Sequence, residues 1–261
     1  MSEEKDFKKQ CLEEITQQGK NASLNQLTRQ WVDESIKSNY SYHFEWLGRP
    51  IIQYPQDIVG TQQLLWQLKP DLIIETGIAR GGSLIFYASI LELIAQCGGP
   101  NDAKVLGIDI DIRAHNKNAI LAHPMSKRIE MIQGSSIDES IVEQVKHKAL
   151  SAKKVLVCLD SNHTHDHVLQ ELRHYAPMVS INSYIIVFDT VVEDLPSSLI
   201  KDRPWSKGNN PKTAVFQYLK ELDNNKDVAG IDDKELRLMI DKQIEDQLLI
   251  TVAPSGFLRR Y

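Results

Sequence analysis

The sequence predicts an α/β protein built on a mostly parallel, doubly wound sheet. Three observations lead to this prediction: short apolar runs recur from residue 71 onward, glycines follow the first run directly, and most runs end in an acidic residue. Continuous rather than alternating apolar runs are typical of strands buried on both faces, and the chain between them is long enough for crossover helices. The five runs cover residues 72–75, 105–109, 129–133, 155–160 and 184–189.

Residues 1–55 precede this pattern and form a predicted helical and lid extension, whereas residues 56–261 form the main domain. Two amphipathic helices are expected before residue 45, because apolar residues recur there at helical spacing. These residues are Phe7, Cys11, Leu12 and Ile15 in the first stripe, and Leu24, Leu27, Trp31, Val32 and Ile36 in the second. The aromatic stretch 40–55 contains two prolines and suits a packed loop or lid.

The C-terminal end predicts a β-hairpin. Residues 248–252 and 256–260 are strand-like and are joined by the turn-forming segment Ala253-Pro254-Ser255. Helices are expected before it, at 213–222 and 234–246. A parallel sheet of seven strands that ends in an antiparallel hairpin is, by analogy, the Rossmann-like fold of class I S-adenosylmethionine (SAM) methyltransferases.

Composition excludes several classes of protein. The chain has 261 residues and a net charge of −5, from 30 Lys and Arg against 35 Asp and Glu, so a nucleic-acid partner is not expected. Its three widely spaced cysteines indicate a reducing compartment. Because the first residues are too polar for a signal peptide and no apolar run approaches ~18 residues, we expect a cytoplasmic protein with no membrane span.

The turn after the first strand carries the first ligand-binding motif. Glu75 and Gly77 are followed by Arg80 and by Gly81-Gly82-Ser83, at the start of a helix. Glycines let a ligand approach the backbone, and the helix offers free N–H groups to a carboxylate or phosphate. The order differs from dinucleotide and P-loop motifs, and Glu75 suits the ammonium group of an amino acid, as in SAM. A plain strand-to-helix turn is the alternative.

The next two strand ends are suited to an adenosine. Asp109 lies 34 residues after Glu75, where a carboxylate can accept hydrogen bonds from both ribose hydroxyls. Ser135 and Ser136 follow the third strand, where an adenine edge is expected. Asp138 is either part of that site or the N-cap of the next helix.

The fourth strand end carries the most informative motif. Asp160 and His163 are followed by His165 and His167, and such a cluster indicates metal or acid–base chemistry. The last two histidines may instead face solvent on the next helix. Asp160 and Asp189, at neighbouring strand ends, form an oxygen-rich site for a hard cation such as Mg²⁺, unless one of them caps a helix and the other binds backbone.

Together these segments resemble the cephalosporin hydroxylase/rhamnosyl O-methyltransferase family from about residue 40 to the C-terminus. The motifs that carry the resemblance are Trp46-Leu47-Gly48-x-Pro50, Gln53-x-Pro55-x-Asp57, Glu75-Thr76-Gly77 with Gly81-Gly82-Ser83, Gly107-Ile108-Asp109, Gln133-Gly134-Ser135-Ser136, Asp160-Ser161-Asn162-His163, Arg203-Pro204-Trp205 and Gly208-Asn209-Asn210-Pro211. The resemblance implies a SAM-dependent, Mg²⁺-assisted O-methyltransferase, often a homo-oligomer, that acts on sugars or natural products. It also implies that residues 75–83 and Asp109 hold SAM, and that Asp160 and Asp189 hold the metal. One departure is Phe188, which stands where the family has a second acid.

The chemistry requires that an alcohol lose its proton, and His163, three residues after Asp160, is the predicted general base. The loop 203–212 is expected to cover a small-molecule or glycan acceptor, unless it is only a solvated surface loop. Its candidate binding residues are Trp205, Asn209, Asn210 and Lys212. A non-haem iron hydroxylase and a non-catalytic binding or assembly protein of the same fold remain as alternative functions.

Overall fold

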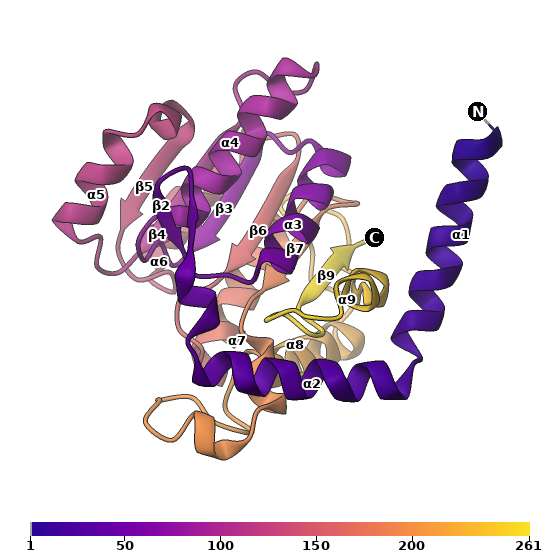
Figure 1. Cartoon of the computed structure of the whole chain (residues 1–261). Coiled ribbons are helices and arrows are strands. Elements are labelled where there is room, and N and C mark those ends of the chain that lie inside the picture. Colours follow the sequence, from indigo (N-terminus) through magenta and orange to yellow (C-terminus); the bar gives the residue numbers. More distant parts are fainter. Residues whose placement is uncertain (1) are drawn as a thin grey trace.

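The computed structural model describes residues 2–261 and shows a central sheet covered by helices on both faces (Figure 1). The strands are β1 (Phe44–Trp46), β2 (Arg49–Ile51), β3 (Leu72–Thr76), β4 (Lys104–Asp109), β5 (Ile129–Gln133), β6 (Val155–Leu159), β7 (Tyr184–Val187), β8 (Leu238–Ile240) and β9 (Phe257–Arg260). The α-helices are α1 (Ser2–Gly19), α2 (Ala22–Lys37), α3 (Pro55–Leu68), α4 (Gly82–Gln96), α5 (Ala114–Leu121), α6 (Glu139–Leu150), α7 (His165–Tyr175), α8 (Pro211–Asn224) and α9 (Lys242–Leu248). The short 3₁₀ helices are η1 (Tyr40–His43), η2 (Pro124–Arg128), η3 (Ala176–Met178), η4 (Thr190–Asp194) and η5 (Ser197–Leu199).

The main sheet has seven strands in the order β5-β4-β3-β6-β7-β9-β8. The first five strands in this order are parallel, whereas β9 runs antiparallel to both β7 and β8. The predicted fold class is therefore confirmed. Because the order reverses between β3 and β6, the carboxyl ends of these strands form the edge at which such sheets bind ligands.

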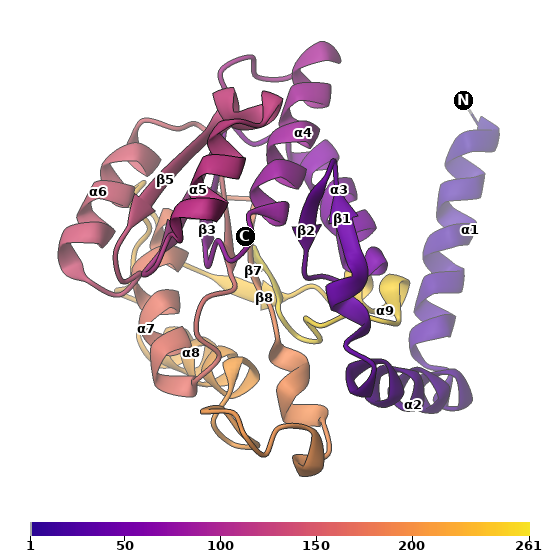
Figure 2. The ribbon, with the colours of Figure 1, turned by 60° about the vertical axis from the view of Figure 1, so that its left-hand side comes forward.

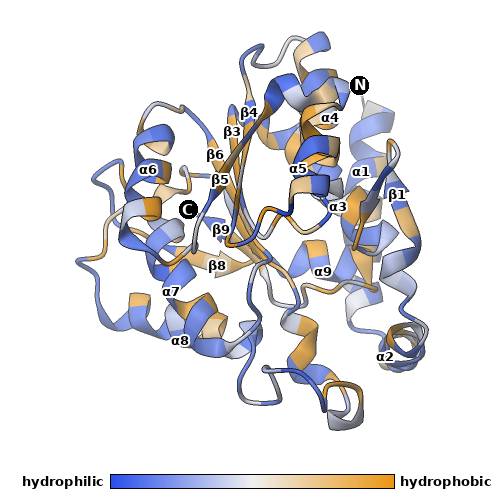
Figure 3. Ribbon diagram, turned by 90° about the vertical axis from the view of Figure 1, so that its left-hand side faces the viewer, coloured by the Kyte–Doolittle hydropathy of each residue, from blue (hydrophilic) through white to orange (hydrophobic). Residues whose placement is uncertain are grey.

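Two hydrophobic clusters, one on each face of the sheet, form the core. One cluster joins β3 and β6 to α6, α7 and α8, and the other joins them to α3 and α4. Figure 3 shows the strands as an apolar layer between these two sets of helices. Since successive strand residues point to opposite faces, burial on both faces explains why the runs are continuously apolar.

The second strand of the predicted C-terminal hairpin is confirmed as β9, but the predicted position of the first strand was wrong. The first strand is β8 rather than residues 248–252, and α9 separates it from β9, so only part of the predicted helix 234–246 is helical. Residues 250–252 are held by contacts outside the sheet. Thr251 and the backbone N–H of Val252 both donate to Asp57 of α3, which attaches this segment to α3 rather than to the sheet.

The N-terminal helices α1 and α2 are both present, as predicted. Figures 1 and 2 show α1 standing off from the body, and its last turn attaches it to α9, where the Gln18 side chain donates to the Asp246 carbonyl at 2.7 Å. Val32 of α2 packs on the segment after β7, against Val191 and Leu195. The aromatic stretch contains the small hairpin β1–β2 where a loop was expected. A domain boundary at residue 55 stays a prediction.

None of the helices within residues 2–261 combines the length and the apolar character needed to cross a bilayer.

Candidate active site at the carboxyl ends of the strands

The carboxyl ends of β3, β6 and β7 lie side by side, and this brings the predicted site residues together. Thr76 is paired with Leu159, and Leu159 with Val187. Beyond the ladder, the Asp160 N–H donates to the Thr76 carbonyl at 2.9 Å, and the Phe188 N–H donates to the Leu159 carbonyl at 3.0 Å. The residues that follow these strands are thus held in register at one edge of the sheet.

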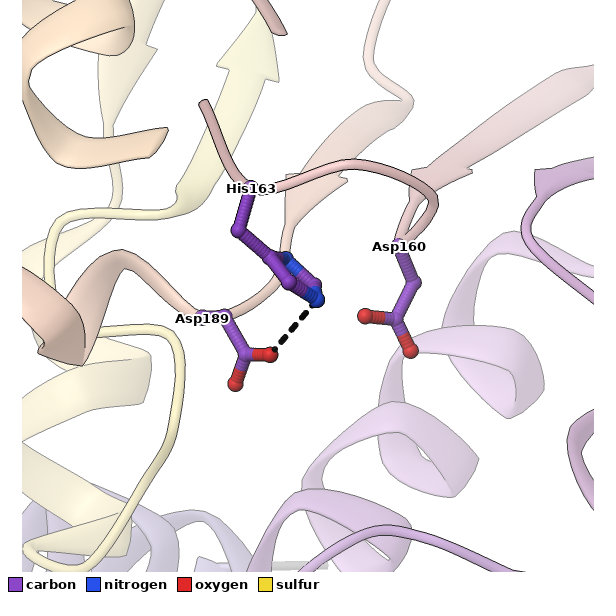
Figure 4. Close-up of side chains that lie close together, drawn as sticks. All are labelled: Asp160, His163 and Asp189. Atoms are coloured by element: carbon purple, nitrogen blue, oxygen red, sulfur yellow. Dashed lines mark ion pairs between the residues drawn. The ribbon is translucent and has the colours of Figure 1, made fainter. Parts of the chain in front are cut away.

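Asp160, His163 and Asp189 form a cluster at this edge (Figure 4). One ligating atom from each residue lies within 4.8 Å of the others, and all three side chains are partly buried. His163 Nε2 is 3.2 Å from Asp189 Oδ2. Asp189 has a φ of 54°, a left-handed conformation that non-glycine residues rarely adopt. This backbone conformation belongs to the turn that carries the Asp189 carboxylate.

The cluster has an excess of negative charge. Burial, the Asp189 carboxylate and the Glu75 carboxylate together raise the pKa of Asp160 well above its usual range. The Asp189 carboxylate disfavours ionisation of Asp160, and a cation between the two would remove this penalty. The donor set of two carboxylates and one imidazole is therefore suited to a divalent metal ion.

Phe188 occupies the place at which the family has an acid. Its ring is 1% exposed and belongs to the hydrophobic core on the α4 side of the sheet, so it contributes to packing alone. The third candidate ligand comes from a different strand end, because the loop after β6 places His163 beside Asp189. The structure thus offers a residue for the position that the sequence leaves without a ligand.

The other two histidines of the motif do not join this cluster. His165 Nδ1 lies 2.7 Å from the Thr213 hydroxyl, and its Nε2 lies 2.9 Å from Gln217 Oε1. His167 Nε2 is 3.1 Å from the Ser136 hydroxyl. Among residues 2–261, the potential metal ligands that come together include one histidine, whereas non-haem iron oxygenases typically use two. The geometry gives the iron hydroxylase alternative no support.

Glu75 lies fully buried at the end of β3. Its Oε2 accepts a hydrogen bond of 2.8 Å from the Ser83 hydroxyl, but Oε1 has no hydrogen-bond partner among the described residues. Burial raises the pKa of Glu75 to about 8, against the opposing effects of the Ser83 and Tyr87 hydroxyl groups. A buried carboxylate oxygen without a partner is costly, and a bound ammonium group would satisfy it.

The glycines of this turn make room for other parts of the protein. A Cβ on Gly77, which has a φ of +90°, would lie 2.1 Å from the Asp160 carbonyl oxygen. A Cβ on Gly82 would lie 2.1 Å from the Pro50 carbonyl oxygen. The turn after β3 is therefore packed directly against the loop after β6 on one side and against β2 on the other. Gly81 precedes α4 as its N-cap residue.

Asp109 holds the same turn from the end of β4. Its Oδ2 accepts hydrogen bonds from the backbone N–H groups of Ile78, at 2.8 Å, and Ala79, at 3.2 Å. Its Oδ1 accepts one from the Asp111 N–H at 3.0 Å. Arg80 is exposed, and its carbonyl accepts hydrogen bonds from the Arg49 side chain. The predicted ribose contact of Asp109 stays a prediction, since a carboxylate can accept further hydrogen bonds.

The two serines after β5 differ in exposure. Ser136 is buried beside His167, whereas Ser135 is partly exposed. Asp138 accepts from the Ser140 N–H at 2.8 Å and is the N-cap of α6, one of the two roles considered for it. Contact of either serine with adenine stays a prediction.

The loop before α8 contributes one aromatic ring to the site. The rings of Trp205 and His163 meet edge to face, with centroids 4.7 Å apart. Asn209 Oδ1 accepts from the His165 N–H at 2.9 Å, which connects the two loops. Trp205 is therefore placed beside the metal-ligand cluster, where an acceptor that reaches the cluster would meet it.

The structure gives Asn210 and Lys212 roles other than the predicted contact with the acceptor. Asn210 is fully buried, and its side chain accepts from the N–H groups of Lys212 and Thr213, so it caps α8. Lys212 is mostly buried and forms an ion pair with Asp194. An asparagine before a proline at the first helical position is a strong cap, which explains why these residues are turned inward.

Glu171 is a further polar residue near the site that the sequence did not single out. It is fully buried on α7, and its Oε1 accepts a hydrogen bond of 2.7 Å from the hydroxyl of Ser161. Ser161 directly follows Asp160, so this contact fixes the loop after β6. Glu171 lies among the apolar residues Val168, Leu169 and Leu172 of α7. An acidic residue among these apolar residues was the signal in the sequence that could have indicated its burial.

The sheet order, five parallel strands followed by an antiparallel pair, defines the class of fold as the Rossmann-like fold of SAM methyltransferases. The fold is similar to that of CmcI solved with Mg and SAM, with a TM-score of 0.54 and 19% identity over 84% of this chain and 77% of that chain. Residues 38–261 match the family described as Rhamnosyl O-methyltransferase/CmcI, and the chain belongs to this family.

Two relatives carry the same family name. The rhamnosyl O-methyltransferase of Mycobacterium bovis (strain BCG / Pasteur 1173P2) is 30% identical over 210 residues, which are 78% of this chain and 73% of the relative. The rhamnosyl O-methyltransferase of Mycobacterium leprae (strain TN) is 29% identical over 218 residues, which are 82% of each chain. The family and the fold together indicate a SAM-dependent O-methyltransferase.

Proposed function

We propose that the protein transfers a methyl group from SAM to a hydroxyl group of a sugar acceptor, with Mg²⁺ bound by Asp160, His163 and Asp189. The observation that carries this proposal is the cluster of two carboxylates and one imidazole within 4.8 Å, next to the turn after β3. The two halves of the site are in contact, since Gly77 of the turn packs on the Asp160 backbone. A donor on the turn and an acceptor on the cluster would thus be neighbours.

The residues of the turn fit SAM. The unpartnered Oε1 of buried Glu75 suits the ammonium group of the donor. The first N–H groups of α4, which starts at Gly82, are suited to its carboxylate. Asp109, at the end of β4, is the residue expected at the ribose.

The cluster likewise fits a divalent cation, because carboxylate oxygens are the ligands that Mg²⁺ prefers. A divalent cation bound there would lower the pKa of an acceptor hydroxyl that it contacts. Asp189 Oδ2 lies 3.2 Å from His163 Nε2, and this contact orients the imidazole. We assign His163 the task of third ligand. His163→Ala should then weaken Mg²⁺ binding and abolish turnover. Abolished turnover with unchanged Mg²⁺ binding would instead make His163 the proton acceptor.

The acceptor side suits a sugar. Trp205 presents an aromatic ring next to His163, and aromatic rings pack well on the apolar faces of sugar rings. The relatives are named rhamnosyl O-methyltransferases, and this name supports a rhamnosyl-type deoxysugar as the first acceptor to test. Asn209 lies in the same loop and is the remaining amide candidate for an acceptor hydroxyl.

The proposal is tested by incubating the protein with SAM labelled in its methyl group and a panel of rhamnosides, other glycosides and catechols. We expect label in a sugar O-methyl group, lost with EDTA and restored by Mg²⁺. Label transfer to no member of the panel, while SAM binds, would count against a sugar acceptor. Undiminished transfer in EDTA would count against the metal.

We also propose that the chain forms homo-oligomers. Phe7 and Leu12 of α1 and Trp66 of α3 are large apolar side chains at the surface, with Phe7 64% and Trp66 45% exposed. Light scattering of the purified protein is the test. We expect a mass of two or more times 29.7 kDa, whereas a monomer at high concentration contradicts the proposal.

A further inference from the structure

Gln53 has a buried carboxamide with no hydrogen-bond partner. The residue is 2% exposed, and neither its Oε1 nor its Nε2 has a partner among the described residues. A buried amide that leaves both its donor and its acceptor unpaired lowers the stability of the folded protein. Such groups are rare in native proteins, and each one calls for an explanation such as a bound ligand.

The position of Gln53 is between the two halves of the candidate active site. Gln53 follows β2, and the β2 residue Pro50 lies against Gly82 at the start of α4, so this segment covers the turn after β3. Figure 2 shows β2 beside α4. The segment thus reaches the first turn of α4, whose free N–H groups were assigned above to the donor carboxylate.

On its other side, Gln53 leads into α3, and α3 is attached to the segment that follows the metal-ligand cluster. Asp57 of α3 accepts from the Val252 N–H at 2.9 Å, and the Val252 carbonyl accepts from the Val191 N–H at 3.1 Å. Val191 is two residues beyond Asp189. The chain before Gln53 is therefore attached to the turn after β3, and the chain after it is attached to the segment that follows the cluster.

The chemistry of the unpaired atoms matches the amino acid end of SAM. A carboxamide offers an N–H donor to a carboxylate and an oxygen acceptor to an ammonium group. Glu75 Oε1 is another unpaired acceptor, and its carboxylate is tied to Ser83, the neighbour of Gly82. The segment after β2 and the turn after β3 thus offer two unpaired acceptors and one unpaired donor. An α-amino acid supplies the complementary groups in one ligand.

We infer that Gln53 is a donor-binding residue that hydrogen-bonds the amino acid end of SAM together with Glu75. The inference rests on the proposed function, because it takes SAM as the methyl donor. It adds the segment between β2 and α3 to the site. It also gives the buried amide of Gln53 a binding partner.

The test is calorimetry with two probes, SAM and 5′-methylthioadenosine, which has the adenosine and the sulfur but lacks the amino acid. Gln53→Met keeps the length of the side chain and removes its donor and acceptor. We expect the Kd for SAM to rise ~10–100-fold, as for the loss of hydrogen bonds to charged groups. The Kd for 5′-methylthioadenosine stays the same, and the ligand-free melting temperature is unchanged or higher.

Thr61→Val is the matched control. Thr61 lies on α3, the helix that follows Gln53, and is fully buried with an unpaired hydroxyl, so its replacement removes a buried unpaired polar group at a nearby position. We expect no change in the Kd for either probe. Gln53→Glu gives a second measurement if Gln53→Met does not fold, because it keeps the shape and places a carboxylate beside the donor carboxylate. It weakens SAM binding and leaves 5′-methylthioadenosine binding unchanged.

An unchanged Kd for SAM in the Gln53 variants, or an equal loss for both probes, overturns the inference while the proposed function stands. Failure of the unmodified protein to bind SAM would instead overturn the proposed function, and this inference with it. The two failures are distinguishable because the first requires intact SAM binding by the unmodified protein.

Discussion

The turn after β3 and the cluster at the ends of β6 and β7 are neighbours, but they are held in different ways. Backbone N–H groups satisfy Asp109 beneath the turn, and close backbone packing at Gly77 fixes its path. In the cluster, by contrast, two carboxylates, those of Asp160 and Asp189, lie close together, and the imidazole of His163 is the third group beside them.

The difference indicates that the cluster, and not the turn after β3, depends on its ligand. The protein itself provides the hydrogen bonds that shape the turn, so its form does not require the donor. In the cluster, burial and the Asp189 carboxylate raise the pKa of Asp160, and a bound cation would remove this penalty. Loss of a cluster residue should therefore abolish chemistry, whereas loss of a turn residue should weaken donor binding.

The largest effect is expected for Asp160→Ala. Methyl transfer should fall by more than ~100-fold, because even residues that only support metal ligands typically contribute 10–100-fold. The Kd for SAM should change little, since the turn is held independently. Turnover and SAM titrations measure the two effects.

Asp166→Ala is the control for that variant, because Asp166 is an exposed acid in the same stretch of chain. It should retain full activity. Equal activity of the unmodified protein and Asp160→Ala would remove Asp160 from the site.

Glu75→Gln should reduce donor affinity and change the pH dependence of stability. The folded protein holds the pKa of Glu75 at about 8, above the 4.5 of a free side chain. The stability contributed by its protonated form is therefore fully present below about 4.5 and is lost as the pH rises through 8.

Denaturant unfolding without ligand at several pH values measures this loss. The unmodified protein should become less stable between pH 5 and pH 8, and Glu75→Gln should flatten that part of the curve. Buried Asp57, whose pKa burial raises to about 7, should leave a residual slope. Identical pH profiles for the two proteins would show that the folded protein does not raise the pKa of Glu75.

Trp205→Ala should have an intermediate effect that is confined to the acceptor. We expect the KM for a sugar acceptor to rise ~10-fold, because an aromatic contact of about 0.5–1.5 kcal/mol is lost in addition to buried area. Trp205→Phe should recover most of the loss. An increase in the Kd for SAM without any change in the acceptor KM would place Trp205 on the donor side.

Asn210→Ala should have the smallest effect on activity. Loss of this cap should lower the free energy of unfolding by about 0.5–2 kcal/mol, with kcat and the acceptor KM unchanged. Thermal and denaturant unfolding measure the stability. A raised acceptor KM with normal stability would return Asn210 to the acceptor site.

The parallel part of the fold was predictable because burial on both faces leaves long apolar runs in the sequence. The predicted runs 72–75 and 105–109 lie within β3 and β4. The C-terminal pair was not predictable in the same way. β8 has three residues and no distinctive pattern, while the apolar run at 248–252 reflects packing near Asp57 rather than a strand.

The site was predictable where the topology alone determines position. Asp160 and Asp189 follow adjacent parallel strands, so their convergence needs no knowledge of side chains. Asn210 shows what the sequence could not decide, because an asparagine that caps a helix and an asparagine that binds a sugar look the same in a sequence. Gln53 shows another, since a polar residue between a strand and a helix gives no sign that its amide is buried and unpaired.

The most direct test of the central claim is a crystal structure of the protein grown with S-adenosylhomocysteine and Mn²⁺ in place of Mg²⁺, with anomalous scattering measured to locate the metal. The account predicts one strong anomalous peak in contact with Asp160 and Asp189, and the amino acid end of the cofactor product at the turn after β3. A metal peak remote from both carboxylates, or a cofactor bound elsewhere, would contradict it.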